Sequence, residues 1–193
     1  MPRPEWWPDE LAHAGNEHLD PEYVAIYDRK SATEPTPDIE LLQELGMGDA
    51  STLVDLGAGT GTFALAAAPV CHRVVAVDVS TMMLRNLREK AEQAGISNLE
   101  VVQAGFLSYQ HAGEPADIAY SRNALHHLPD FWKVIALKRV AALLRPGGVF
   151  RLHDLVFDCG PDEVESVVEA WLSGAKDRPE DGWTRAELEE HVR

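Results

Sequence analysis

Cysteine and long apolar runs are scarce in this 193-residue chain. The two cysteines, Cys71 and Cys159, lack the CxxC spacing. The longest apolar run, FALAAAPVC at 63–71, is shorter than the ~20 residues that a membrane span needs. The first residues show no leader of charged, apolar and small-residue zones. The sequence therefore predicts a cytoplasmic protein with two reduced thiols and no membrane partner.

Positive charge is scarce as well, since 17 Lys and Arg stand against 32 Asp and Glu, a formal net charge of −15. Binding to nucleic acid needs a basic face that displaces counterions from phosphate, so this balance argues against a nucleic-acid partner. It argues equally against an anionic membrane surface. The clearest basic cluster, LRNLREK at 84–90, has the spacing of a solvated helix face.

The chain does contain a regular alternation of apolar runs and helical stretches, and its length suits one domain with a sizeable core. Nearly continuous apolar runs separated by helices predict a parallel sheet covered on both faces. The expected strands are 51–56, 73–79, 98–104, 116–121 and 148–154. The expected helices are 36–46 with Thr36 as N-cap, 60–68, 80–95 with Ser80 as N-cap, 130–148 ending in the breaker RPGG, and 162–175.

The stretch LVDLGAGTGTFALAAA at 53–68 places Gly57, Gly59 and Gly61 between an expected strand and an expected helix. Such a turn exposes backbone N–H groups and lets a ligand approach without a Cβ in the way. The spacing is GxGxG, not the GxGxxG of a dinucleotide site, and no GK[ST] follows. Asp78 ends the next strand, 21 positions after Gly57, where a carboxylate accepts hydrogen bonds from ribose hydroxyls. The pattern predicts a ribose-bearing ligand without a pyrophosphate.

Four segments together resemble the successive motifs of class I S-adenosylmethionine-dependent methyltransferases. They are VDLGAGTG at 54–61, DVS at 78–80 followed by Met83-Leu84, SRNALHHLPD at 121–130 and LLRPGGVFRLHD at 143–154. The resemblance covers residues 36–157, and the subgroup it suggests acts on small molecules, similar to the ubiquinone/menaquinone-biosynthesis type. It implies transfer of a methyl group from S-adenosylmethionine, the cofactor, to a small-molecule acceptor by in-line displacement.

The resemblance also implies a fold. It is a doubly wound, Rossmann-like α/β fold whose mainly parallel sheet has the strand order 3-2-1-4-5, with helices on both faces. Residues 1–35 would form a helical lid, 36–157 the cofactor-binding core and 158–193 a helical C-terminal segment. The antiparallel hairpin that usually completes this sheet is not evident after residue 157, so we expect that a C-terminal portion is missing from the chain.

Roles around the glycine turn follow from the same resemblance. Backbone groups of the turn would hold the methionine part of the cofactor, Asp55 would approach its ammonium group, and Asp78 would bind both ribose hydroxyls. Val79 and Met83 would pack on the adenine, although plain core packing explains them equally well. The expected cofactor-binding residues are Tyr27, Asp55, Gly57, Ala58, Gly59, Gly61, Asp78, Val79, Met83, Gly105, Phe106 and Ser121.

One position departs from the family pattern. The family usually has an acidic residue after the third strand, which accepts a hydrogen bond from the adenine amino group. This chain has QAGFLSY at 103–109, with Phe106 at that point. Phe106 would either stack on the adenine, with its backbone N–H on a ring nitrogen, or fill the core.

Candidates for a general base lie at the carboxyl ends of strands four and five. We expect His153 first and His127 second as catalytic residues, because a histidine suits proton removal near neutral pH. A structural role in a loop that opens a helix explains HHLPD at 126–130 more simply. No HExxH is present, and adjacent histidines alone do not chelate, so we expect no metal.

The N-terminal aromatics also fit the resemblance. YVAIYDRKS at 23–31 would bring Tyr27 to the methionine carboxylate, and Trp6 and Trp7 would line an apolar acceptor pocket. An amphipathic helix packed on the core is an equal alternative. Two other functions stay open, namely an NAD(P)-dependent oxidoreductase and a non-catalytic module that binds S-adenosylmethionine and regulates a partner. The sequence leaves a homodimer open, and it does not identify the acceptor or the methylated atom.

Overall fold

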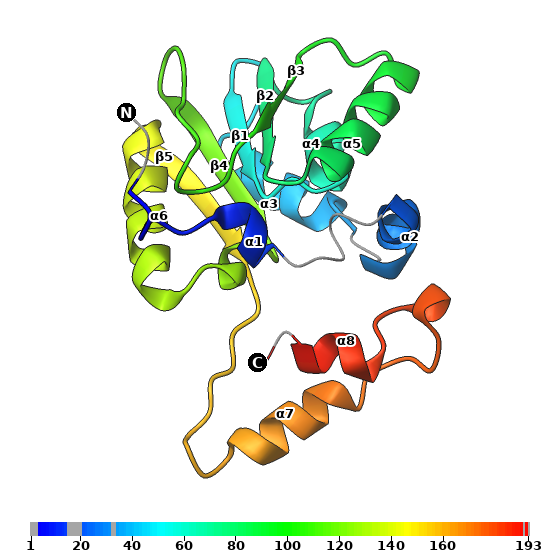
Figure 1. Cartoon of the computed structure of the whole chain (residues 1–193). Helices are drawn as coiled ribbons and strands as arrows, with labels where there is room; N and C mark the ends of the chain where they lie inside the picture. Colours follow the sequence, from blue (N-terminus) through cyan, green and yellow to red (C-terminus); the bar gives the residue numbers. More distant parts are fainter. Residues whose placement is uncertain (1–3, 15–20, 32–33, 191, 193) are drawn as a thin grey trace.

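The computed structural model describes residues 4–14, 21–31, 34–190 and 192 of the chain. Its centre is one five-stranded sheet in the order β3-β2-β1-β4-β5 (Figure 1). The strands are β1 Thr52–Leu56, β2 Arg73–Asp78, β3 Leu99–Gln103, β4 Ala116–Arg122 and β5 Leu144–His153. Every pairing between neighbouring strands is parallel. The predicted doubly wound, Rossmann-like sheet with the order 3-2-1-4-5 is confirmed.

Helices connect and cover these strands. The helices of the described residues are α1 Glu10–His13, α2 Pro21–Ser31, α3 Thr36–Glu44, α4 Thr62–Ala67, α5 Thr81–Gln93, α6 Asp130–Leu143, α7 Val164–Leu172 and α8 Arg185–Glu190, with the 3₁₀ turns η2 Leu125–His127 and η3 Pro179–Asp181. Ser80 caps α5 as predicted, since its side chain accepts a hydrogen bond from the Met83 amide at 3.2 Å. The predicted cap of α3 is wrong by one position. Thr36 is its first residue, and the Glu34 carboxylate accepts a hydrogen bond from the Thr36 amide at 3.0 Å.

The last strand begins earlier than predicted. The stretch RPGG at 145–148 does not separate α6 from β5, because β5 already starts at Leu144, which pairs with Ala116 of β4. The ladder shifts register between Ala116 and Ile118. A bulge of this kind lets a strand contain residues that would otherwise end it.

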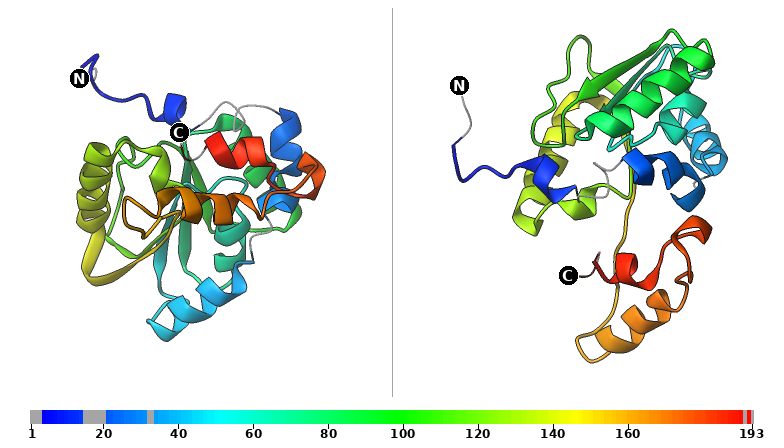
Figure 2. Two further views of the ribbon diagram at one scale, coloured as in Figure 1. Left: turned by 90° about the horizontal axis from the view of Figure 1, so that it is seen from below. Right: turned by 45° about the vertical axis from the view of Figure 1, so that its right-hand side comes forward.

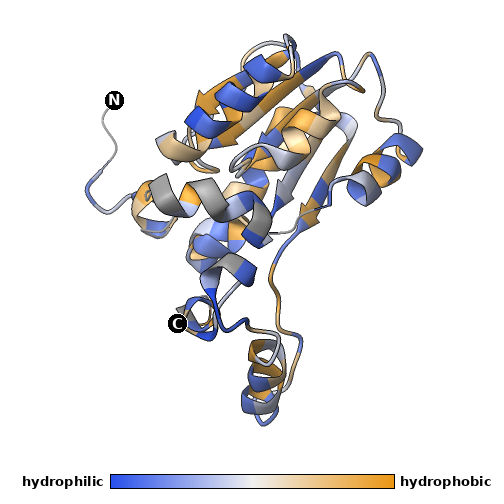
Figure 3. Cartoon of the chain, turned by 90° about the vertical axis from the view of Figure 1, so that its right-hand side faces the viewer, coloured by the Kyte–Doolittle hydropathy of each residue, from blue (hydrophilic) through white to orange (hydrophobic). Residues whose placement is uncertain are grey.

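Alternate residues of the strands face two separate apolar layers. One layer packs strand residues such as Leu53 and Val74 against α3, α4 and α5. The other packs Val54 and Val75 against α6 and the loop after β3. Figure 3 shows apolar residues along the strands and the helices that flank them. Because both faces of the sheet are covered, a ligand has access at the ends of the strands.

Helices from both ends of the chain gather where the carboxyl ends of the strands point. In Figure 1, α1 and α2 lie beside this edge, and the α7–α8 segment lies beyond it, reached by the extended stretch after β5. Figure 2 shows the same arrangement from below and from the side. Among the helices of the described residues, none has the length and apolar character that crossing a bilayer requires.

Candidate functional site

The glycine turn connects β1 to α4, and at Gly57 it leaves no room for a side chain. Gly57 has a φ of +78°, and a Cβ built on it would lie 2.2 Å from the Cβ of Ala124. Gly59 has a φ of +55°, and its N–H donates a hydrogen bond to Asp78 Oδ2 at 2.8 Å. Glycine is required at position 57 both for the left-handed angle and for the close approach of the loop after β4.

Asp78 joins the glycine turn to the start of α5. Its Oδ2 accepts the Gly59 hydrogen bond, and its Oδ1 accepts one from the Ser80 N–H at 2.8 Å. Burial raises the pKa of the Asp78 carboxyl, and the hydrogen bonds from the Ser80 and Gly59 amides oppose that rise. A carboxylate has about four lone-pair positions, so acceptor positions are left for a ligand.

Asp55 in β1 is the second carboxyl group beside the turn, and its side chain is buried. Burial raises the pKa of Asp55 to about 8, and the negative charge of Asp78 adds to the rise. Burial, followed by the charges of Asp78 and Asp28, raises the pKa of Tyr27 to about 12. Two carboxyl groups whose ionisation is costly favour a ligand that brings positive charge to this place.

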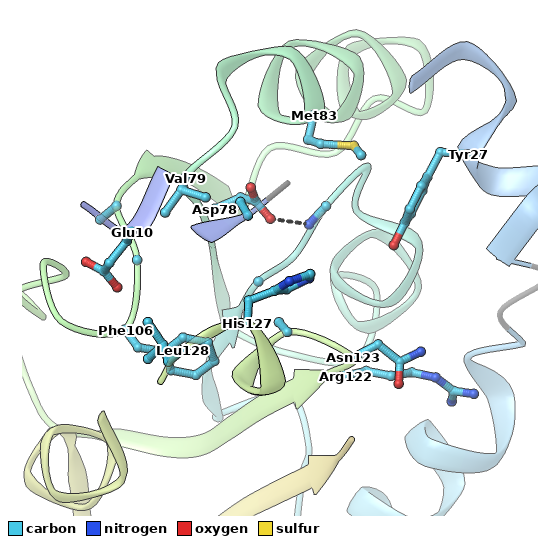
Figure 4. Close-up of a pocket in the computed structure, with 16 residues that line it drawn as sticks. Glu10, Tyr27, Asp78, Val79, Met83, Phe106, Arg122, Asn123, His127 and Leu128 are labelled. Carbon is cyan, nitrogen blue, oxygen red and sulfur yellow. Dashed lines mark hydrogen bonds between the residues drawn. The ribbon is translucent and has the colours of Figure 1, made fainter. Parts of the chain in front are cut away.

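A cavity opens among the glycine turn, α1, α2 and the loop after β4 (Figure 4). We call it the Asp78 cavity. It is lined by Glu10, Ala14, Tyr27, Gly57, Gly59, Asp78, Val79, Met83, Ala104, Gly105, Phe106, Arg122, Asn123, Ala124, His127 and Leu128. In Figure 4, Tyr27 and Glu10 lie at opposite ends, with Asp78 between them. Most of the expected cofactor-binding residues are therefore together, and Asp55 and Ala58 line an adjoining hollow that shares Tyr27 with this cavity.

Two expected cofactor-binding residues, Gly61 and Ser121, do not line the Asp78 cavity. A Cβ built on Gly61 would lie 2.0 Å from Leu87 Cδ1, so this glycine serves the close packing of α4 on α5. Ser121 is fully buried and pairs with Leu152 of β5, because β4 continues for one more residue. The structure gives neither residue a direct contact with a ligand in the cavity.

A second cavity, of about 300 Å³, lies between the edge of the sheet and the C-terminal segment. We call it the histidine cavity. It is lined by Tyr27, Ser31, Asn123, His126, His127, His153, Asp154, Leu155, Trp171, Trp183 and Leu188. Tyr27, Asn123 and His127 line both cavities, whereas His153 lines only the histidine cavity. The side chain of His127 therefore stands at the boundary between the two spaces.

Asp154 fixes the turn that carries His126 and His127. Its Oδ2 accepts hydrogen bonds from the Leu125 and His126 amides at 2.8 and 3.1 Å, and its Oδ1 lies 2.5 Å from His126 Nδ1. Burial opposes ionisation of Asp154, but the hydrogen bond and the charge of His126 hold its pKa below the usual range. The described residues contain no group of three or more His, Cys, Asp or Glu side chains placed to bind a metal ion.

Sequence reasoning missed Glu10 of α1. Its carboxylate accepts hydrogen bonds from the Leu107 amide at 2.8 Å and from the Ser108 hydroxyl at 2.7 Å. These contacts tie α1 to the loop after β3. No local pattern marks Glu10, because its partners are about a hundred residues away in the chain and only the folded arrangement brings them together.

The N-terminal tryptophans were expected in an acceptor pocket. The structure packs both on α6, and Trp7 also lines a cavity that shares Glu10 and Val79 with the Asp78 cavity. The ring centroid of Trp7 lies 4.8 Å from that of Trp132 in α6, and Trp6 stacks on Trp132 at 6.3 Å. Trp7 also packs against the apolar layer that contains α6. Stacking among these three indoles attaches the N-terminal segment to α6.

The family model and the curated relative that match the chain are both described as methyltransferases. The family model that matches the chain is described as a methyltransferase domain and covers residues 53–148. The 27-O-demethylrifamycin SV methyltransferase of Amycolatopsis mediterranei is 26% identical over 165 residues, which are 84% of this chain and 57% of that protein. The chain spans about half the length of the curated relatives it matches.

Solved structures show the same fold. The YcgJ protein of Bacillus subtilis has 25% identity and a TM-score of 0.60, over 81% of this chain and 66% of that one. Phosphoethanolamine N-methyltransferase 1 of Haemonchus contortus, solved with phosphoethanolamine and S-adenosylhomocysteine, has 18% identity and a TM-score of 0.60. That match covers 72% of this chain and 30% of the other, and it shows the fold alone.

Proposed function

Because the chain belongs to the class I S-adenosylmethionine-dependent methyltransferases, we propose that it transfers a methyl group from S-adenosylmethionine to a small-molecule acceptor. The Asp78 cavity carries the proposal, since a glycine turn and a half-buried carboxylate at the end of β2 face one space there. The matching family model and the curated relative named above also favour methyl transfer over the hydride transfer that a similar fold supports in oxidoreductases.

The residues of the Asp78 cavity fit the cofactor along its length. Asp78 accepts hydrogen bonds from the ribose, and Val79 and Met83 offer apolar surface to the base. The amino-acid end then lies toward Tyr27 and the hollow beside Asp55, where its ammonium group meets a buried carboxyl. The cofactor carries both a sulfonium and an ammonium charge, which suits two carboxyl groups that are costly to ionise alone.

The histidine cavity is the proposed acceptor site. When bound, S-adenosylmethionine supplies a methyl group that its sulfonium already activates, so the protein has mainly to align the acceptor and exclude water. Trp171, Trp183 and Leu188 close this cavity on the C-terminal side. Because Tyr27, Asn123 and His127 line both cavities, the methyl group would pass among these three residues.

We propose that His127 removes the proton that the acceptor loses. It lies at the boundary of the two cavities, and Asp154 holds its turn in place through two backbone hydrogen bonds. A neutral imidazole is a suitable base at neutral pH. His153 lines the acceptor side only, so its role is contact with the acceptor.

The location and partners of the protein are part of the same proposal. Cys71 and Cys159 are both free thiols, which supports a reducing compartment such as the cytoplasm. A formal charge of −15 supports a small molecule, and not a nucleic acid, as the acceptor.

Binding of S-adenosylhomocysteine tests the proposal before an acceptor is known. Calorimetric titration of the full chain should show one site, and Asp78→Ala should weaken binding by at least about tenfold because hydrogen bonds to a charged group are lost. Asp49→Ala changes an exposed aspartate, so this control should bind as the unchanged protein does. A folded protein that binds neither S-adenosylmethionine nor S-adenosylhomocysteine would refute the proposal.

Turnover separates an enzyme from a module that only binds the cofactor. Production of S-adenosylhomocysteine is measured with a panel of small phenols, carboxylic acids and amines. An acceptor that supports turnover should lose it in His127→Asn by about a hundredfold, as expected for loss of a general base. Tight cofactor binding with no turnover across the panel would favour the regulatory module.

A further inference from the structure

The Asp78 cavity ends at a loop that has no acidic side chain of its own. Residues 103–109 after β3 read QAGFLSY. A Cβ built on Gly105 in this loop would lie 2.2 Å from Glu10 Oε1 and 2.5 Å from Glu10 Cδ. The carboxyl group of Glu10 therefore occupies the space that a side chain at position 105 would take. Gly105 is not among the glycines with positive φ, so the positions of Glu10 and of Val79, whose Cγ1 would lie 2.9 Å from the built Cβ, require glycine here, not the backbone angle.

Hydrogen bonds fix Glu10 in this place. The Leu107 amide donates to Oε1 at 2.8 Å, and the Ser108 hydroxyl donates to Oε2 at 2.7 Å. Ser108 is itself held, because its Oγ accepts a hydrogen bond from the Gly105 N–H at 2.7 Å. A carboxylate has about four lone-pair positions, and these two hydrogen bonds use one on each oxygen.

The position of Asp78 decides which end of a bound nucleoside reaches Glu10. If the ribose is at Asp78, the amino-acid part extends toward Tyr27 and the hollow beside Asp55. The base then extends the other way, toward Val79, Phe106 and Glu10, which lie across the cavity from Tyr27 in Figure 4.

The Phe106 N–H and the Glu10 carboxylate together complement the hydrogen-bonding edge of adenine. The Phe106 N–H has no hydrogen-bond partner among the described residues. The next residue in the loop is Leu107, whose amide donates to Glu10. A donor and a carboxylate acceptor side by side complement a ring nitrogen next to an amino group, which is the edge of adenine. Hypoxanthine presents a ring N–H and an oxo group there, so both of its groups would face the wrong partner.

We propose that Glu10 accepts a hydrogen bond from the amino group of the adenine base, so that α1 supplies the carboxylate that the loop after β3 lacks. This inference rests on the proposed function. It makes Glu10 a specificity-determining residue, since a carboxylate accepts from an amino group and repels an oxo group. It also gives the N-terminal segment a part in binding the cofactor, because α1 belongs to that segment.

The test compares S-adenosylhomocysteine with S-inosylhomocysteine, its analogue with an oxo group in place of the amino group. The unchanged protein should prefer the adenosyl compound by roughly tenfold to a hundredfold, as expected when a charge-assisted hydrogen bond is replaced by a repulsive contact. Glu10→Gln keeps an oxygen for the Leu107 amide and adds a donor that suits the oxo group. In this variant the preference should fall to roughly threefold or less.

Two further variants complete the test. Glu5→Gln changes an exposed glutamate of the same segment and should keep the full preference. Glu10→Ala should lower the preference. Adding Gly105→Asp together with Val79→Ala should raise it again, because these two alanines remove both side chains that a Cβ at position 105 would meet.

The outcomes are distinguishable. A Glu10→Gln protein that binds both compounds more weakly but keeps their ratio would mean that Glu10 only supports the loop, which overturns the inference. Glu10→Ala that binds S-adenosylhomocysteine more tightly would mean that Glu10 obstructs the site, which also overturns it. If the unchanged protein binds neither compound, the proposed function fails and the inference falls with it.

Discussion

Asp55 is the residue whose charge should respond most to the cofactor. Burial and the nearby Asp78 raise its pKa to about 8, so at neutral pH the free protein carries mostly the protonated acid. An ammonium group beside it favours the carboxylate. Affinity for S-adenosylhomocysteine should therefore increase from pH 6 to pH 8, by at most about tenfold per pH unit, with release of a proton. Calorimetry in two buffers of different ionisation enthalpy measures that proton.

The raised pKa of Asp55 should also make the stability of the unliganded protein depend on pH. An acid whose folded pKa is above its ordinary value of about 4 contributes stability that is fully present below that value. This contribution is lost as pH rises toward 8. Asp55→Asn should flatten both the binding and the stability profile, whereas Asp49→Asn on the surface should flatten neither. If the unchanged protein already gives flat profiles, Asp55 is ionised before the ligand arrives.

At the scale of single residues, the sequence could place a side chain where a short segment determines its position. Gly57 follows the last residue of β1 and Asp78 ends β2, so the register of these two parallel strands brings them to the same edge. Ser121 lies outside both cavities, because β4 extends one residue further than the apolar run suggests and the side chain stays buried in the sheet. Glu10 could not be found, because its position depends on how α1 docks on a distant loop.

The packing of α4 on α5 depends on Gly61. Its φ is +85°, and a Cβ there would lie 2.0 Å from Leu87 Cδ1, which is fully buried and has little room to move. Gly61→Ala should lower the free energy of unfolding by about 2–5 kcal/mol, combining the cost of a left-handed alanine with that of overpacking. Urea unfolding followed by circular dichroism measures the loss.

A substitution at Gly46 separates the cost of a left-handed alanine from the cost of overpacking. Gly46 has a φ of +100°, but a Cβ built there meets nothing within 4 Å. Gly46→Ala should therefore lose only about 1–2 kcal/mol, the part that belongs to the backbone. Equal losses in the two variants would contradict a tight contact between α4 and Leu87.

Helices and strands were predictable here because their signals are local. The cap at Ser80 and the apolar runs of β1 and β2 each lie within a few residues of the element they define. The start of β5 was missed because Pro and Gly at 146–148 normally end an element, and only pairing with β4 extends the strand through them.

For the whole molecule, the strand order could be predicted because right-handed crossovers leave few topologies for alternating strands and helices. The arrangement of the two terminal segments could not. Their contacts with the core are side-chain contacts over long sequence separations, as between Lys30 of α2 and Glu187 of α8. The histidine cavity exists only because these segments meet, so its shape had no signal in the sequence.

The Lys30–Glu187 ion pair connects the C-terminal segment to α2. The Lys30 side chain is 1% exposed, and its ammonium lies 4.9 Å from the ring centroid of Tyr23 and 5.2 Å from that of Trp183. Glu187→Gln removes the opposite charge and leaves the Lys30 ammonium buried without it. Breaking a buried ion pair in this way lowers the free energy of unfolding by about 3–5 kcal/mol. The C-terminal segment should therefore separate from α2, and hydrogen exchange across residues 164–190 should become faster.

Separation of the C-terminal segment from α2 should affect the histidine cavity and leave the Asp78 cavity unchanged. Residues 164–190 contribute Trp171, Trp183 and Leu188 to the histidine cavity but none of the residues that line the Asp78 cavity. Glu187→Gln should accordingly raise the KM for an acceptor while affinity for S-adenosylhomocysteine stays within about twofold, a change of under 0.5 kcal/mol. Asp181→Asn, in an exposed pair with Arg178 of the same segment, should change neither. A parallel loss of cofactor affinity in Glu187→Gln would mean that the C-terminal segment also supports the Asp78 cavity, and the separation of donor and acceptor sites would have to be abandoned.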